Sequence, residues 1–353
     1  MRKERNYGID LLRIVLMFMV CMLHTLGQGG VLEASNTGSF GYKTFWFLEI
    51  LSYCAVDGFA IISGYMASNK PRKYEKLVDM WFQVFFYSFV VTLIFTVIGI
   101  NKNWRLFDIF RCMLPVTYGK FWYFTAFFAL FLAIPILNQF IFAINENISK
   151  KVFIILVVMF SIMGFLGDPF NTDGGYSAIW LIVLYCIGAL AKRIKLFEDK
   201  KTITLILLWT LCIFVTWGLL VFIGPGRWTN FVSYISPTIL LSGMIMVILF
   251  SRIQLKGKII TKLSPLVFGI YLFQLNQVVY NDIIKDAFAF VASKNIAVGV
   301  LYVFAFALAI FVSGLVVEFI RSKIAKWLKI PLLSQKIVVL ADKLLVKASI
   351  FLK

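Results

Sequence analysis

Runs of mainly apolar residues alternate with short polar segments along almost the whole chain of 353 residues. Runs of about 16 to 25 such residues are long enough to cross the hydrocarbon core of a bilayer as helices. The pattern predicts ten membrane-spanning helices, over residues 9–27, 46–68, 78–99, 121–144, 152–167, 177–191, 202–223, 231–250, 265–284 and 295–320. Between the third and fourth runs, charges three residues apart in the 101–120 stretch predict a short amphipathic or re-entrant helix at the outer surface.

Composition indicates the same fold class. Hydrophobic residues make up 61% of the chain, the mean hydropathy is +0.89, and only 15% of the residues are charged. A soluble domain carries about 25% charged residues, so we expect an all-α, polytopic membrane protein. The five cysteines lie in or beside apolar runs and include no C-x-x-C pair. A disulfide framework or a zinc site is therefore not expected, and no metal ligands are assigned.

The chain carries a net charge of +18, and its basic residues are unevenly distributed. With the N-terminus placed in the cytoplasm, 26 Lys and Arg residues fall in inside-facing segments and eight in outside-facing ones. This follows the positive-inside rule, so both termini are predicted to be cytoplasmic. Attraction to an anionic lipid surface explains the charge without a nucleic-acid partner. After a spanning domain at residues 1–320, the basic tail 321–353 has the pattern of an amphipathic helix on the inner membrane surface.

The first apolar run contains Asp10, Arg13 and His24, and His24 is the only histidine of the chain. Charged groups at the bilayer centre cost at least about 2.5 kcal/mol each, and they are usually functional. Arg13 and His24 are eleven residues apart. At ~100° and ~1.5 Å per residue they share one helix face, about 16 Å apart. Asp10 can pair with Arg13 across one turn. A structural ion pair and a packed histidine are the alternatives to a catalytic set of these three residues.

The same side chains suit group transfer. A neutral imidazole can activate a hydroxyl as a general base, or carry an acyl group. A guanidinium can bind an anionic group or stabilise developing negative charge. The sequence Gly-Gln-Gly-Gly after the run is not a small-x-small cleavage site, so we expect the run to remain as the first span. Where H-x-x-x-D acyltransferases have aspartate, this chain has Gln28, and it contains no Walker A or G-x-G-x-x-G sequence.

Further candidate positions follow along the chain. Asp57 lies in mid-span, where a carboxylate needs a buried donor, and Arg13 or another group is its expected partner. The small pair Ser63-Gly64 is explained equally well by close helix packing, and an aromatic belt accounts for Trp122 and Tyr123. The candidate binding residues outside the first run are Asp57, Ser63, Gly64, Tyr65, Arg72, Lys73, Arg111, Trp122 and Tyr123.

Several of these segments together resemble the acyltransferase-3 family of integral-membrane acyltransferases. The resemblance begins with Arg5-Asn-Tyr-Gly-Ile-Asp10-Leu-Leu-Arg13 and the ten-residue spacing from Arg13 to His24. It continues through about residue 320. The further matching segments are Ile62-Ser63-Gly64-Tyr65, Trp122-Tyr123 with the later Pro135 and Asn138, and Gly269-Ile-Tyr271-Leu272-Phe. Many relatives carry a second histidine after that Tyr-Leu pair, where this chain has Gln274, so a relay of two histidines is not expected here.

The resemblance implies about ten spans and transfer of an acyl group, often acetyl, to carbohydrate at the cell surface. Acyl-CoA would be the donor substrate and no bound cofactor is implied. Its phosphates would meet Arg13 and the loop containing Arg72 and Lys73. The acceptor would be a surface polysaccharide or a lipid-linked sugar, and an extracytoplasmic transferase is a possible partner because this chain has no appended hydrolase-like domain. The expected location is the bacterial plasma membrane.

Two rival interpretations stay open at this point. A transporter or flippase for a glycan or lipid-linked intermediate would also place charges inside the membrane. It would more often show broken helices in two repeated halves, and the sequence contains no strong internal repeat. A membrane sensor that has kept the fold and lost the activity is the third possibility, and the replacement of histidine by Gln274 keeps it open.

Overall fold

The computed structural model describes residues 5–101, 104–224 and 231–351, and within these ranges the chain forms helices and no strands. The all-α prediction is therefore confirmed. Lys102 and Arg227, two of the basic residues assigned to outside-facing segments, lie outside the described ranges.

The helices of the first half are α1 (Tyr7–Leu23), η1 (His24–Gln28), α2 (Val31–Ala34), α3 (Phe40–Tyr53), α4 (Ala55–Tyr65), α5 (Glu75–Phe85), η2 (Phe86–Val91), α6 (Thr92–Val97), α7 (Leu106–Met113), α8 (Trp122–Ala143), α9 (Glu146–Leu156), η3 (Val157–Ile162) and α10 (Met163–Gly167). Those of the second half are η4 (Asp173–Gly175), α11 (Ala178–Arg193), α12 (Thr202–Ile223), α13 (Pro237–Ser251), α14 (Lys258–Leu263), η5 (Ser264–Leu266), α15 (Val267–Gln274), α16 (Gln277–Val279), η6 (Tyr280–Ile284), η7 (Ala289–Ser293), α17 (Ile296–Trp327) and α18 (Ile330–Phe351).

Each of the ten predicted spans contains a helix. In the described part of the chain, seven helices are long and apolar enough to cross a membrane, and an eighth span results if the bent pair Lys258–Gln274 and Gln277–Ser293 counts as one. The predicted spans 177–191 and 231–250 correspond to α11 and α13, which are shorter helices. The chain is thus a polytopic membrane protein.

Several predicted boundaries differ from the structure. The second span begins at Phe40 rather than at residue 46, and the fifth begins at Glu146 rather than at residue 152. The eighth span begins as a helix only at Pro237, whose fixed φ suits the first turn. The ninth is broken at Asn276 and bends by 60°, because the Asn276 side chain caps the next helix by accepting from the backbone N–H groups of Val278 and Val279. The tenth does not end at residue 320, since α17 continues to Trp327.

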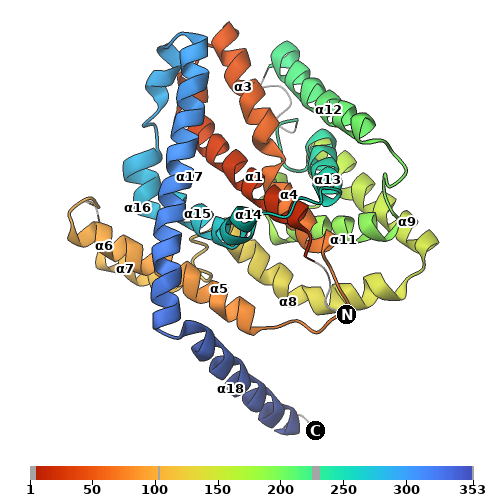
Figure 1. Cartoon of the computed structure of the whole chain (residues 1–353), viewed down its shortest axis with the longest axis vertical. Coiled ribbons are helices and arrows are strands. Elements are labelled where there is room, and N and C mark those ends of the chain that lie inside the picture. Colours follow the sequence, from red (N-terminus) through yellow and green to blue (C-terminus); the bar gives the residue numbers. More distant parts are fainter. Residues whose placement is uncertain (1–4, 102–103, 225–230, 352–353) are drawn as a thin grey trace.

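The helix that carries Asp10, Arg13 and His24 lies at the centre of the molecule (Figure 1). Residues of α1 pack against α3, α4, α13, α15 and α17. By contrast, large apolar side chains of α12 and α17 point outward, such as Phe222, which is 89% exposed, and Leu301, which is 68% exposed. These outer faces suit contact with lipid tails, and the inner helices form the core that positions the site.

Two glycines let α4 and α11 approach each other closely. A Cβ atom at Gly64 would lie 1.9 Å from the backbone oxygen of Tyr185, and one at Gly188 would lie 2.3 Å from that of Ile61. No real Cβ fits at those distances, so only glycine permits this contact. Small residues are the usual means of bringing membrane helices together, and this packing accounts for Gly64.

The beginning of α1 and the C-terminal helix α18 lie toward the same end of the molecule (Figure 1). An even number of spans produces that arrangement. The predicted amphipathic tail is helical as α18, which packs on α5, and Ser334 Oγ donates to Asp79 Oδ1 at 2.6 Å. Its position on the inner membrane surface stays a prediction.

Candidate active site

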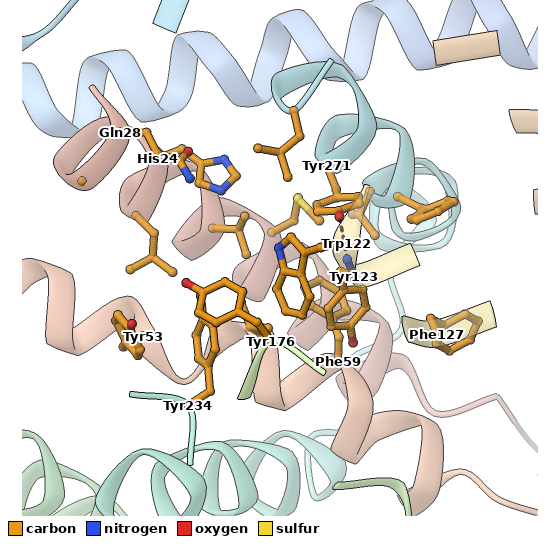
Figure 2. A pocket seen from close by; sticks show the side chains of 18 of the residues that line it. His24, Gln28, Tyr53, Phe59, Trp122, Tyr123, Phe127, Tyr176, Tyr234 and Tyr271 are labelled. Carbon is orange, nitrogen blue, oxygen red and sulfur yellow. Dashed lines mark hydrogen bonds between the residues drawn. The ribbon is translucent and has the colours of Figure 1, made fainter. Parts of the chain in front are cut away.

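A cavity of about 720 Å³ lies along one side of α1. Arg13 lines its inner end and His24 lines its outer end, so the face that these two residues were predicted to share borders one continuous space. The walls come from α1, η1, α3, α4, α8 and α15, with loops closing the outer end. Figure 2 shows part of this lining.

At the inner end, Asp10 holds the Arg13 guanidinium in place. Arg13 Nη1 lies 2.7 Å from Asp10 Oδ1, so the predicted ion pair is present. The buried Asp10 carboxylate also accepts hydrogen bonds from Arg5 Nε and, at 3.1 Å, from Ser264 Oγ. Arg13 and Ser264 line the cavity, whereas Asp10 does not. The arrangement presents a fixed positive charge to whatever enters this end.

At the outer end, His24 begins a short π-helical turn. The backbone N–H of Gly29 donates to the His24 carbonyl, five residues earlier, at 2.8 Å. Such turns inside α-helices occur frequently at functional sites. Within the described residues, His24 Nδ1 is buried and has no hydrogen-bond partner. The Gln274 side chain, fully buried, lies beside both His24 and Cys21.

The glycines after His24 have a structural reason. The segment 286–288 runs alongside the end of η1, where the N–H of Asp286 donates to the Gln28 carbonyl at 3.0 Å and that of Phe288 donates to the Gly29 carbonyl at 2.9 Å. A Cβ at Gly29 would lie 2.4 Å from the Phe288 ring, and Gly30 adopts φ +83°. Glycine at positions 29 and 30 therefore permits the loop to pack closely against the π-helical turn, which keeps His24 at the cavity.

Aromatic rings form the wall opposite His24 (Figure 2). The Trp122 ring centroid lies 4.7 Å from that of Tyr176 and 6.3 Å from that of Tyr234, and the Tyr53 ring lies 4.8 Å from Tyr234. All four residues line the cavity, as does Tyr123. The backbone N–H of Tyr123 donates to the Tyr271 hydroxyl at 3.3 Å. We call the space between Trp122, Tyr53, Tyr176, Tyr234 and His24 the outer chamber.

Comparison with known proteins decides the family. The acyltransferase-3 family model, described as an acyltransferase domain, matches residues 6–318, which is nearly the whole chain and includes both ends of the cavity. The chain belongs to the acyltransferase-3 family. It is accordingly a membrane acyltransferase. No curated protein and no solved structure matches the chain.

In this acyltransferase-3 protein, three predicted residues of the second span lie away from the cavity. Asp57 is fully buried, and its partner is not Arg13: Trp180 Nε1 donates to Asp57 Oδ1 at 3.0 Å. Arg13 is instead engaged by Asp10. Gly64 serves the packing of α4 on α11, and the Tyr65 hydroxyl lies 3.2 Å from Ser251 Oγ. The fourth, Ser63, does line the cavity, where its hydroxyl donates to the Phe59 carbonyl at 3.0 Å.

The predicted basic residues of the acyltransferase are also outside the lining, apart from Arg13. The Arg72 guanidinium lies 5.3 Å from the centre of the Phe131 ring, and Lys73 is exposed. Arg111 belongs to α7, the short helix predicted in the 101–120 stretch, and lies 4.4 Å over the Phe107 ring. Substrate contacts for these three stay predictions, whereas the structure brings Arg13, His24, Ser63, Trp122 and Tyr123 together around one cavity.

Glu49 is a cavity residue of the acyltransferase that the sequence patterns did not reveal. It lies on α3, is 7% exposed, and faces the cavity. A Cβ at Gly27 would lie 3.7 Å from Glu49 Oε1, so the carboxyl group sits against the π-helical turn. The sequence does contain an indication of it, because a carboxylate near the start of an apolar run is as unusual as the mid-span carboxylate of Asp57. Tyr176 lies in the loop before α11, and Tyr234 lies just before α13, inside the predicted span 231–250, so neither gave such a signal.

Within the described residues, no group of three or more His, Cys, Asp or Glu side chains is arranged to hold a metal ion. The chemistry derived below uses the side chains of the cavity alone. These are a guanidinium at one end, an imidazole at the other, and hydroxyl and aromatic groups between the imidazole and the outer mouth.

Proposed function

We propose that this membrane acyltransferase moves an acyl group, such as acetyl, from cytoplasmic acyl-CoA to a hydroxyl group of a cell-surface or exported carbohydrate. The observation that carries the proposal is the single cavity with Arg13 at one end and His24 at the other. A donor on one side of a bilayer and an acceptor on the other require such a connection. The location that fits this role is the plasma membrane of a bacterium.

The donor would enter at the inner end. A guanidinium held by Asp10 suits the phosphates of CoA, because charge-assisted hydrogen bonds to phosphate are among the strongest in proteins. The exposed Lys73 and the partly buried Arg72 follow α4 and would add positive charge outside the cavity. The extended pantetheine arm would then pass along the apolar side chains of the cavity, such as Phe127 and Phe268, towards His24.

At the outer end, His24 would act as the general base. The acceptor hydroxyl oxygen attacks the thioester carbonyl carbon, a C–O bond forms and the C–S bond breaks. The imidazole takes the hydroxyl proton and returns it to the departing CoA thiolate, so the balance of atoms and charge needs no further reactant. With Gln274 rather than a second histidine beside it, His24 would do this proton transfer alone.

The direct test replaces His24 by alanine and by glutamine in a strain whose own gene is deleted. Mass spectrometry of the surface polysaccharide should show O-acyl groups with the wild-type protein and none with either variant. Gln139→Ala, at an exposed position on α8, is the matched control and should restore acylation. Full acylation by a folded His24→Ala protein would contradict the assigned role of the imidazole. Arg13→Ala alone is less informative, because it alters both binding and an ion pair.

The rival function is transport of a glycan or lipid-linked intermediate without covalent chemistry. A transporter is expected to have paired broken helices in two related halves. The described part of the chain has one bent pair, around Asn276. The deletion strain separates the two functions, because a transporter would change the amount of surface glycan and leave its acyl content per sugar unchanged.

A further inference from the structure

The outer chamber contains a carboxyl group that the reaction described above does not use. Glu49 is only 7% exposed and borders the cavity. Its Oε2 atom is buried and has no hydrogen-bond partner within the described residues. Buried polar atoms in proteins nearly always have partners, so each exception calls for an explanation. A ligand that donates a hydrogen bond to this oxygen supplies one.

Three neighbours fix where such a ligand would lie. The Glu49 carboxyl group sits against the π-helical turn at Gly27, three residues after His24. Tyr53 follows it by one turn on α3, and Tyr53 and Tyr234 line the same cavity as Glu49. A group bound to Glu49 therefore lies inside the outer chamber, between the imidazole and the tyrosines.

The remaining walls have the chemistry of a sugar site. Trp122 and Tyr176 line the cavity with aromatic rings, against which the C–H side of a pyranose ring can pack, and the hydroxyls of Tyr53, Tyr176 and Tyr234 can bond ring hydroxyls. Small-molecule sites characteristically combine apolar walls with a few such polar groups. Glu49 provides a hydrogen-bond acceptor where the outer chamber borders the π-helical turn that carries His24.

The charged side chains at the outer mouth of the cavity indicate whether the sugar acceptor is charged or neutral. Among the described residues, the outer lining also contains two acidic residues, Glu33 and Asp286, and one basic residue, Lys285. Like charges brought together at an interface weaken binding of the wrong partner. A carboxylate or phosphate on the acceptor would meet this acidic rim before reaching His24.

From these observations we infer that the outer chamber binds an uncharged sugar ring, and that Glu49 holds the hydroxyl that is acylated against His24. Glu49 is then a positioning residue for the acceptor. The inference rests on the proposed acyltransfer to carbohydrate. It adds to that proposal the class of acceptor and the group that orients it.

The test uses the purified full-length protein in nanodiscs with labelled acetyl-CoA. The acceptors are matched pairs of methyl glycosides, those of glucose and galactose beside the corresponding uronic acids. The wild-type protein should acylate a neutral glycoside with at least about tenfold higher kcat/KM than its uronic acid partner. Slow acetyl-CoA hydrolysis in the absence of any glycoside reports on the donor end independently.

Glu49→Gln keeps the size of the side chain and replaces its carboxyl group by an amide. Loss of the carboxyl oxygen leaves the bound hydroxyl without its buried partner and should lower kcat/KM for the neutral glycoside about 10- to 100-fold. The KM for acetyl-CoA and the hydrolysis rate should stay within about twofold, because the donor end is untouched. Glu49→Asp should recover part of the activity, and Glu75→Gln, on α5 outside the cavity, is the matched control.

Three results have distinct meanings. Equal use of neutral and acidic glycosides, or unchanged acceptor kinetics in folded Glu49→Gln, overturns the inference and leaves the proposed acyltransfer standing. A parallel fall in acetyl-CoA hydrolysis and glycoside transfer also overturns it, since that pattern indicates a general structural role. Absence of any acyl transfer by the wild-type protein, with unchanged polysaccharide in the deletion strain, refutes the proposed function itself.

Discussion

Arg13 Nη1 lies 2.7 Å from Asp10 Oδ1, one turn earlier on the central helix α1. The two residues differ in what they face, because Arg13 borders the cavity and Asp10 is buried behind it. Asp10 also accepts a hydrogen bond from Ser264, which ties α1 to the segment leading into α15. Asp10 thus acts on the site through Arg13, whose guanidinium it orients.

Asp10→Asn is expected to weaken donor binding. An asparagine in this place removes the opposite charge and turns an amide N–H or a neutral oxygen towards the guanidinium. We expect the KM for acetyl-CoA to rise about tenfold, equivalent to about 1.4 kcal/mol, with a smaller change in kcat. Steady-state kinetics in nanodiscs measure both. Asp79→Asn, which affects the contact between α5 and α18, is the control, and an unaltered donor KM in folded Asp10→Asn would show that Arg13 does not need this orientation.

The relationship between Arg13 and His24 was predictable, and the local structure around His24 was not. Helical periodicity places both residues on one face, and that face borders the cavity. Periodicity assumes a regular helix, however, and the chain changes to a π-helical turn at His24. That turn is stabilised by the loop at 286–288, more than 250 residues away in the sequence, so no local pattern could reveal it.

Gln274→His is expected to be tolerated and to alter the pH dependence of transfer. Gln274 is fully buried beside His24, and histidine is similar in size and polarity. A second imidazole should add an ionisation to the kcat profile between about pH 5 and 8. Gln274→Leu removes the polar neighbour of His24 and should lower kcat about tenfold. Rate measurements across this pH range test both variants, with Gln139→His at an exposed position of α8 as the control. A folded but inactive Gln274→His protein would contradict the expected tolerance.

The second span illustrates a different limit of sequence reasoning. Asp57 and Glu49 are carboxylates eight residues apart in one apolar region. Asp57 has a buried donor, Trp180 on α11, and lies outside the cavity, whereas Glu49 faces it. Which of the two meets the cavity depends on how α3, α4 and α11 pack, and that packing follows from long-range contacts rather than from the spacing of residues in either segment.

Gly64→Ala is expected to destabilise the protein strongly. Its Cβ would meet the Tyr185 carbonyl oxygen at 1.9 Å, and backbone cannot move aside as a flexible side chain does. We expect a loss of about 3 kcal/mol or more, as severe overpacking gives. Gly218→Ala on α12 is the matched control, because nothing lies within 4 Å of the added Cβ. That change should be neutral or should stabilise the helix by up to about 1 kcal/mol. Thermal unfolding in detergent compares them, and equal midpoints would contradict the close packing of α4 on α11.

Asp168 organises the loop that brings Tyr176 to the outer chamber. Its Oδ1 accepts hydrogen bonds from the N–H of Thr172 at 2.9 Å and from the Thr172 hydroxyl at 2.6 Å, and its Oδ2 accepts from the N–H of Gly174 at 3.2 Å. Partial burial opposes ionisation of this carboxyl group, but the hydrogen bonds outweigh it and hold its pKa below the ordinary value of 3.8. The carboxylate is therefore ionised, and the loop held, throughout the neutral range.

Asp168→Ala should consequently raise the KM for the sugar acceptor about tenfold through Tyr176, since it removes all three hydrogen bonds, and should leave the KM for acetyl-CoA unchanged. Asp168→Asn should have a smaller effect, because its amide oxygen can still accept from Thr172. Asp173→Asn, in the same loop and with φ +55°, which asparagine tolerates, is the control.

The lowered pKa of Asp168 also predicts how the loop responds to pH. The ionised carboxylate stabilises the loop at pH values above its ordinary pKa, and this stabilisation is lost as the pH falls through the lowered pKa. Acceptor KM in the wild-type protein should therefore be constant from pH 8 down to about pH 5, and a rise already within that range would contradict the role assigned to Asp168.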